Sequence, residues 1–200
     1  DLAYLCCLPN VVVMAPSDEA ELAKMVMTAS KHSDGPIFCR YPRGEGEGVD
    51  IIDIVQDVKI GKGRIIKTGK DLAILALGTR VGSALKVADH LLQYNLKITV
   101  ADARFAKPID TQLVEKLWNE HQKLIIIEEG SAGGFSSHCL HFLSSKDLLN
   151  KHDKEIKCLT MPDNFQDHAS QKEQLAKAGL DTDGLMKVVS KMIPLSLIHI

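Results

Sequence analysis

The feature of this sequence that most constrains its fold is the alternation of short apolar runs with longer stretches of helical period. The run at 72–77, Leu-Ala-Ile-Leu-Ala-Leu, is typical of a strand buried on both faces. The next stretch places five apolar residues on one helical face, namely Val81, Leu85, Ala88, Leu91 and Leu92. Since such strands need helices on both sides, the pattern predicts an α/β domain with three layers around a mostly parallel sheet.

The same alternation continues toward the end of the chain. We predict further strands at 64–67, 98–101, 124–127 and 156–159. Helices are expected around Leu113 and Leu117, from Phe135 to Leu149, and around the apolar positions 185, 188, 189 and 192. Together these elements predict one domain over residues 60–193.

The first 45 residues predict a β-α-β unit. The strand at 11–15 is followed by Pro16 and by Ser17, which is a good N-cap for a helix that ends at Asp34-Gly35-Pro36. A second strand follows at 37–39. Because so short a unit cannot cover both faces of a parallel sheet, we interpret residues 1–45 as the end of a larger α/β domain. The acidic, glycine-rich stretch 46–59 is interpreted as a linker.

The segment 40–44, Arg-Tyr-Pro-Arg-Gly, is the main candidate for chemistry. It follows the second predicted strand, at the edge of an open α/β sheet where ligands usually bind. Pro42 restricts its own φ angle and biases Tyr41 toward extended geometry, so Arg40 and Arg43 are held on a stiff segment. Guanidinium groups suit a phosphate or a carboxylate. The alternative is that both arginines pair with carboxylates of the protein itself.

The turn 130–135, Gly-Ser-Ala-Gly-Gly-Phe, joins a predicted strand to a predicted helix. This geometry can expose backbone amides to an anion, but the turn matches no phosphate-binding motif, and we interpret it as a plain tight turn between strand and helix. Glu128 and Glu129 precede the turn and point to opposite faces of their strand. We therefore expect a structural hydrogen-bonding role for one of them and a solvated position for the other, rather than an acid and base pair.

We interpret three other groups of reactive side chains as structural rather than catalytic or metal-binding. His138 and His141 are spaced i, i+3, but the sequence shows no third metal ligand. Asp102 and Arg104 are interpreted as an ion pair at a strand end. The five cysteines lack a Cys-x-x-Cys pair, and we interpret them as reduced, mostly buried thiols; their positions are 6, 7, 39, 139 and 158.

The composition of the chain excludes two classes of partner. In 200 residues, 24 basic and 26 acidic side chains give a net charge of -2, so the chain lacks the basic patch of a nucleic-acid-binding protein. No apolar run approaches the roughly 20 residues that a membrane-spanning helix needs. We expect neither nucleic acid nor membrane as a partner.

Six motifs taken together resemble the 1-deoxy-D-xylulose-5-phosphate synthases, a transketolase-like family of thiamine-diphosphate enzymes. The motifs are Asp-Leu-Ala-Tyr-Leu-Cys-Cys-Leu-Pro (1–9), Ala-Pro-Ser-Asp-Glu (15–19), Arg-Tyr-Pro-Arg-Gly (40–44), Gly-Lys-Gly (61–63), Asp-Ala-Arg-Phe-Ala-Lys-Pro (102–108) and Glu-Glu-Gly-Ser-Ala-Gly-Gly (128–134). Their order and spacing match the family from residue 1 to about residue 192. The tail 194–200 does not, and we interpret it as a cloning or assembly artefact.

The resemblance implies a fold, a reaction and a role for Arg43. Residues 1–45 would end a pyrimidine-binding domain, and residues 60–193 would form a transketolase C-terminal domain. The family condenses pyruvate with D-glyceraldehyde 3-phosphate, with loss of carbon dioxide, using thiamine diphosphate and Mg²⁺. The resemblance places Arg43 on the phosphate of the aldehyde, with Arg40 and Tyr41 as supporting neighbours. It assigns no catalytic, cofactor-binding or metal-binding residue within this chain.

The resemblance also predicts the state of the whole protein. A homodimer is expected, in the cytoplasm of a bacterium or in the plastid stroma of a plant, and this chain alone is expected to be inactive. The alternatives are a transketolase-like enzyme, a 2-oxoacid dehydrogenase beta-type subunit, or a non-catalytic module that serves only in dimerisation.

Overall fold

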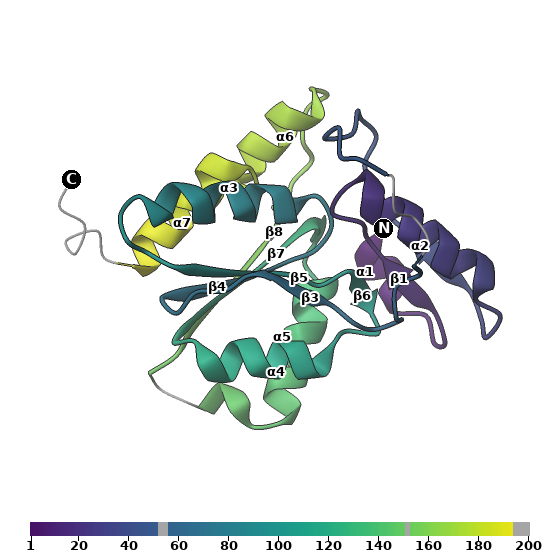
Figure 1. Ribbon diagram of the computed structural model, residues 1–200, viewed down its shortest axis with the longest axis horizontal. Helices are drawn as coiled ribbons and strands as arrows, with labels where there is room; N and C mark the ends of the chain where they lie inside the picture. Colours follow the sequence, from purple (N-terminus) through teal and green to yellow (C-terminus); the bar gives the residue numbers. More distant parts are fainter. Residues whose placement is uncertain (52–55, 151–152, 194–200) are drawn as a thin grey trace.

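The computed structural model describes residues 1–51, 56–150 and 153–193, which form two β-sheets with flanking helices (Figure 1). The larger sheet has five strands in the order β3-β5-β4-β7-β8. Its strands are β3 (Arg64–Lys67), β4 (Leu72–Ala76), β5 (Ile98–Asp102), β7 (Lys123–Ser131) and β8 (Glu155–Met161). All neighbours pair in parallel except β3 and β5, which are antiparallel. The predicted mostly parallel sheet is confirmed.

Helices cover both faces of this sheet. On one face lie α3 (Arg80–Leu92), α6 (Gln171–Ala178) and α7 (Thr182–Met192), and on the other lie α4 (Thr111–Glu120) and α5 (Phe135–Ser145) (Figure 1). The predicted three-layer arrangement is therefore confirmed. The sequence prediction missed α6, although a capping box between Ser170 and Glu173 precedes it and Gly179, with φ of 69°, ends it.

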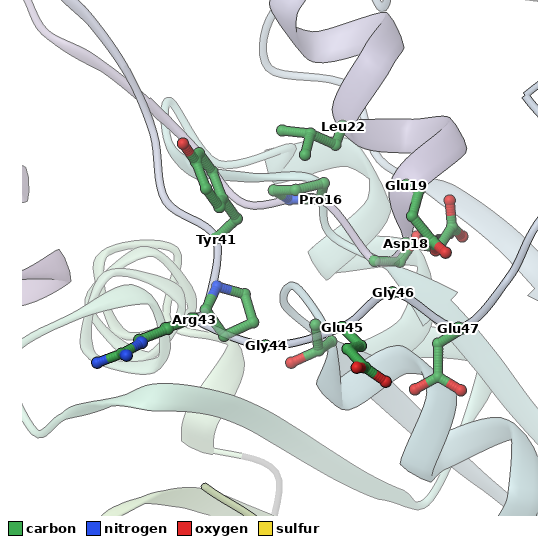
Figure 2. A pocket seen from close by; sticks show the side chains of 13 residues that line it. Pro16, Asp18, Glu19, Leu22, Tyr41, Arg43, Gly44, Glu45, Gly46 and Glu47 are labelled. Carbon is green, nitrogen blue, oxygen red and sulfur yellow. Dashed lines mark hydrogen bonds between the residues drawn. The ribbon is translucent and has the colours of Figure 1, made fainter.

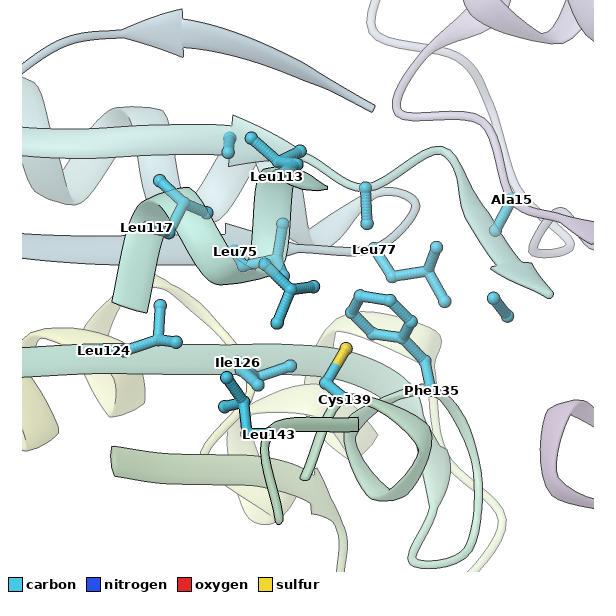
Figure 3. Packing of buried hydrophobic residues seen from close by; sticks show 14 of the residues in the cluster. Ala15, Leu75, Leu77, Leu113, Leu117, Leu124, Ile126, Phe135, Cys139 and Leu143 are labelled. Carbon is cyan, nitrogen blue, oxygen red and sulfur yellow. The ribbon is translucent and has the colours of Figure 1, made fainter. Parts of the chain in front are cut away.

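The central strands are buried on both faces because each face packs against helices. Leu75, Leu124 and Ile126 contact the layer of α4 and α5, where Phe135 and Cys139 lie beside them (Figure 3). The alternate residues of the same strands pack against α3 and α7. Since full burial of one such side chain contributes about 1.5 to 3 kcal/mol, these two layers of apolar residues stabilise the fold.

The smaller sheet has three strands in the order β2-β1-β6. The strands β1 (Val12–Met14) and β2 (Ile37–Cys39) are parallel and are joined by α2 (Glu19–Lys31), which confirms the predicted β-α-β unit. The strand β6 (Phe105–Lys107) pairs antiparallel with β1, so a segment that follows β5 of the larger sheet completes the smaller one. The short helix α1 (Leu2–Cys6) packs between β1 and α5. The sequence prediction missed both α1 and β6.

Two predicted helix ends are wrong. The N-cap of α2 is Asp18 rather than Ser17, because the Asp18 carboxylate accepts a hydrogen bond from the backbone N–H of Glu21 at 2.8 Å. The helix α5 ends at Ser145, and a separate 3₁₀ helix, η1 (Leu148–Asn150), follows.

The predicted linker has neither helix nor strand in its described parts, 46–51 and 56–59. The rest of it, residues 52–55, and the predicted artefact at 194–200 lie outside the described residues. The domain boundaries at 45, 59 and 193 stay predictions.

Candidate functional site

The segment 40–44 leaves the smaller sheet at the carboxyl ends of β1 and β2, where the sequence placed it. The backbone N–H of Arg40 donates to the carbonyl of Met14 at 2.8 Å, so Arg40 extends the pairing of the two strands by one residue. Beyond Arg40 the chain has no regular secondary structure as far as residue 51. Arg40 is therefore the last residue of this segment that the sheet holds.

The side chain of Arg40 is paired with two carboxylates. Its Nη2 lies 2.8 Å from Oε1 of Glu129 on β7, and its Nε lies 3.5 Å from Oδ2 of Asp1. The Arg40 side chain is only 19% exposed. The alternative interpretation from the sequence, pairing with the protein's own carboxylates, thus describes Arg40.

Glu129 connects Arg40 to the start of α3. Its Oε2 accepts a hydrogen bond from Oγ1 of Thr79 at 3.4 Å and lies 3.9 Å from Nη2 of Arg80. The Arg80 guanidinium is itself held by the carbonyl oxygen of Leu180 at 2.7 Å. The expectation that one carboxylate of the Glu128 and Glu129 pair is solvated is wrong, because two guanidinium groups draw Glu129 inward.

Glu128 has the structural role predicted for the other member of the pair. Its carboxylate is fully buried and accepts hydrogen bonds from the backbone N–H groups of Phe135 and Ser136, at 3.0 and 2.8 Å. The hydroxyl of Ser136 donates a third bond at 2.7 Å. An internal carboxylate therefore occupies the anion position at the N-terminus of α5.

The glycines of the turn are explained by this carboxylate. A Cβ atom at Gly130 or Gly134 would lie 2.8 or 2.6 Å from Oε2 of Glu128. The amide of Gly133 donates to the hydroxyl of Ser137 at 2.9 Å. Because these donors serve the chain itself, the interpretation of the segment as a plain tight turn is confirmed.

Arg43 differs from Arg40 in being exposed. Among the described residues it makes no hydrogen bond or ion pair, and it borders a cavity of about 360 Å³. Pro16, Leu22 and Tyr41 supply an apolar side of this cavity. In Figure 2 the guanidinium group of Arg43 extends away from the carboxylates of the opposite rim.

The opposite rim of the cavity is acidic and is tied to α2. Oε1 of Glu19 accepts hydrogen bonds from the backbone N–H groups of Gly48 and Val49, at 2.6 and 3.4 Å. Backbone N–H groups, first its own and then that of Gly48, lower the pKa of the Glu19 carboxyl. A Cβ atom at Gly46 would lie 2.1 Å from the same oxygen, so this glycine allows the acidic stretch to close over α2.

Asp102 and Arg104 do not form the predicted side-chain ion pair. Asp102 accepts the backbone N–H of Arg104 at 2.9 Å, whereas its ionic partner is Arg64, at 3.3 Å. The Arg104 guanidinium binds Glu21 on α2 at 2.7 Å, because a φ of 59° at Arg104 turns the chain away from β5. Burial raises the pKa of Asp102 to about 6. Arg64 on β3 also lies 3.1 Å from Glu21, so the two pairs of Glu21 join α2 to the larger sheet and to the turn that follows β5.

The remaining reactive groups are dispersed. Within residues 1–51, 56–150 and 153–193, no group of three or more His, Cys, Asp or Glu residues could hold a metal ion. Burial first, and then Lys107 and His141, lower the pKa of His138. The five cysteines are free, and burial raises the pKa of Cys39 and of Cys158 to about 11. Cys7 alone of the five is exposed.

The fold defines an α/β domain around a mostly parallel five-stranded sheet, and the segment 40–44 leaves the smaller sheet that packs beside it. Residues 61–185 match the family model described as "Transketolase, C-terminal domain". The chain therefore belongs to the transketolase C-terminal domain family. In the part of the chain that the structure describes, no helix has the length and apolarity to cross a membrane.

A solved structure described as a split gene transketolase, inactive beta4 tetramer, is similar to this chain. The two share 27% sequence identity and superpose with a TM-score of 0.82. The similarity covers 99% of this chain and 62% of that one, so this chain spans less than two thirds of its length. The transketolase-like part of the resemblance is thus supported over almost the whole chain.

Sequence reasoning missed the residues that hold the site together. Thr79, Arg80 and Asp1 surround the Arg40 and Glu129 pair, and no local pattern singles them out. Arg40 and Glu129 are 89 residues apart, and only the packing of the two sheets brings them into contact.

Proposed function

We propose that this chain is the carboxy-terminal part of a thiamine-diphosphate-dependent transferase, 1-deoxy-D-xylulose-5-phosphate synthase. The enzyme would join pyruvate to D-glyceraldehyde 3-phosphate with loss of carbon dioxide, for isoprenoid, thiamine and pyridoxal biosynthesis. Membership of the transketolase C-terminal domain family supports the enzyme class. The Arg-Tyr-Pro-Arg-Gly segment, in combination with the other five motifs, favours the synthase over its relatives.

The observation that carries the proposal is the contrast among the five arginines. Four of them form ion pairs with carboxylates of the chain, at positions 40, 64, 80 and 104. Arg43 has no such partner among the described residues and borders a cavity. A guanidinium group that is held on a stiff segment and left without a carboxylate is suited to a phosphate dianion. We assign Arg43 to the phosphate of the aldehyde substrate, with Tyr41 beside it.

The acidic rim does not oppose this assignment. Glu19 is bonded to backbone amides, and the carboxylates of Glu45 and Glu47 lie on the far side of the segment from the Arg43 guanidinium in Figure 2. A phosphate that approaches Arg43 from its open side would therefore avoid these charges. The cavity would then receive the uncharged part of the substrate against Pro16 and Tyr41.

Thiamine diphosphate and Mg²⁺ belong to the proposal through the family. When bound, the cofactor supplies the carbanion chemistry of pyruvate decarboxylation. The resemblance assigns neither cofactor nor metal ligands to residues of this chain, and we propose none here. In the proposed full-length enzyme these ligands would come from a part of the protein that this chain does not contain.

Arg43→Ala in the full-length enzyme tests the assignment. Loss of the charge-assisted bonds should raise KM for D-glyceraldehyde 3-phosphate roughly 10- to 1000-fold, equivalent to about 1.5 to 4 kcal/mol, with little change in KM for pyruvate. Lys116→Ala is the matched control, because Lys116 is an exposed cation on α4, far from the segment in the sequence. Equal changes for both substrates would refute the role of Arg43.

A second candidate is a transketolase-like enzyme or a 2-oxoacid dehydrogenase beta-type subunit. The similarity to a split gene transketolase favours it, since the match extends over 99% of this chain. Steady-state assays of the full-length protein decide between the two. Use of a ketose donor in place of pyruvate would select the transketolase-like enzyme. Use of a lipoyl acceptor in place of the triose phosphate would select the 2-oxoacid dehydrogenase subunit.

The third candidate is a non-catalytic module that serves in dimerisation. The similar solved structure is an inactive tetramer, which is compatible with an assembly role for this region. Light scattering of the full-length protein should give the mass of the proposed homodimer. A dimer without thiamine-dependent turnover on any of the three substrate classes would support the module and contradict the enzyme.

A further inference from the structure

Glu129 lies where it can control the segment that carries Arg43. It extends from β7 of the larger sheet, whereas the segment belongs to the end of β2 in the smaller sheet. The 2.8 Å ion pair with Arg40 joins the two, and both side chains are largely buried, at 14% and 19% exposed. A contact of this kind is screened less than a surface ion pair.

The geometry points to Glu129 as a positioning residue for Arg43. Resting on the function proposed above, we infer that Glu129 acts through Arg40 to hold the Arg43 guanidinium in place for the substrate phosphate. Only Tyr41 and Pro42 separate the two arginines, and the proline ring restricts one of the few free backbone torsions. A side chain that fixes Arg40 therefore fixes the start of a short, stiff arm.

Few hydrogen bonds hold this arm among the described residues. The backbone N–H of Arg40 bonds to the carbonyl of Met14 at 2.8 Å, and the next hydrogen bond from the backbone of the segment is that of the Gly48 N–H to Glu19. Seven residues, 41–47, lie between these two points without a helix or strand. The orientation of the arm thus depends on how firmly Arg40 is held at its beginning.

Glu129 also determines which arginine remains available to an anion. It faces the guanidinium groups of Arg40 and Arg80 and the hydroxyl of Thr79, and Asp1 faces Arg40 from the other side. These carboxylates neutralise Arg40, so a phosphate is attracted to Arg43 instead. Without the negative charge of Glu129, the two inner guanidinium groups would repel each other, and Arg40 would compete with Arg43 for the phosphate.

Glu129→Gln in the full-length enzyme tests this inference, since it removes the charge while keeping the size of the side chain. The readout is kcat/KM for D-glyceraldehyde 3-phosphate compared with that for D-glyceraldehyde, which lacks the phosphate. We expect a loss of about 10-fold or more for the phosphorylated aldehyde and a change below about 3-fold for the other. The control is Glu155→Gln, which removes a partly exposed carboxylate from the neighbouring strand β8.

Introducing both substitutions separates this inference from the proposed function. If Glu129 acts through Arg43, Glu129→Gln should cause no further loss in an Arg43→Ala background. An additional selective loss in that background would overturn the inference, as would equal losses for both aldehydes in the single variant. If Arg43→Ala is selective for the phosphate and Glu129→Gln is not, the proposed function stands and the inference falls.

A second variant keeps the test valid if Glu129→Gln fails to fold. Arg40→Gln breaks the same ion pair from the other side and leaves Glu129 bonded to Thr79. The same selective loss for the phosphorylated aldehyde is expected. A variant that folds and retains the preference for the phosphorylated aldehyde would contradict the positioning role.

Discussion

The buried carboxylate of Glu128 should be one of the most sensitive positions in the larger sheet. Glu128→Gln replaces one carboxylate oxygen with an NH₂ group that cannot accept a hydrogen bond. Whichever way the amide turns, at least one donor loses its acceptor, either the Phe135 N–H at 3.0 Å or the Ser136 N–H and hydroxyl at 2.8 and 2.7 Å. An unsatisfied buried donor costs about 1 to 3 kcal/mol. Loss of the charge at the N-terminus of α5 adds about 0.3 to 2 kcal/mol.

The free energy of unfolding should therefore fall by about 1 to 5 kcal/mol. Urea denaturation followed by the fluorescence of Trp118, which is buried, measures this change. Glu115→Gln, at an exposed position on α4, is the control and should change the stability by less than about 0.5 kcal/mol. A loss below about 0.5 kcal/mol for Glu128→Gln as well would refute the idea that an internal anion organises the turn.

Two further predictions concern the same region and the neighbouring sheet. Gly134→Ala should destabilise the protein by about 1 to 3 kcal/mol, because the new Cβ would lie 2.6 Å from Oε2 of Glu128. The control is Gly82→Ala in α3, whose Cβ would meet no atom within 4 Å and which should not destabilise the protein. Equal urea midpoints for the two variants would contradict this prediction. Burial raises the pKa of Asp102 to about 6, so its contribution to stability is present in full below pH 4 and is lost as the pH rises through 6. Compared with Asp102→Asn, the protein should lose roughly 3 kcal/mol between pH 4 and pH 7, and a difference that stays constant with pH would exclude the shift.

The larger sheet could be predicted because its signal is local. The strand β4 and the helix α3 have different hydrophobic periods, and a strand buried on both faces leaves a continuous apolar run. The short elements gave no comparable signal. The strand β6 has only three residues, and it is a strand because β1 offers it a pairing edge. The helix α1 has five residues, too few for a helical period to be read.

The candidate site also has a part that could be predicted from local sequence and a part that could not. The position of the segment 40–44 at the end of β2 followed from the order of elements, and the likeness of its residues to a known family suggested the phosphate. The sequence could not predict that Arg40 is paired and Arg43 is exposed. This difference depends on Glu129, which lies 89 residues away from Arg40 in the sequence. The partner of Asp102 was missed for a related reason: Arg64 reaches it across the antiparallel pair of β3 and β5.

Two groups of ion pairs join the smaller β-α-β unit to the larger sheet, and they differ in how directly they hold the segment 40–44. The pairs of Glu21 with Arg64 and Arg104 fasten α2 to the larger sheet and lie away from the segment 40–44 in the sequence. The pair of Arg40 with Glu129 lies directly at the start of that segment. Because the pairs of Glu21 remain in place when the Arg40–Glu129 pair is removed, its removal should change the placement of Arg43 more than the stability of the fold.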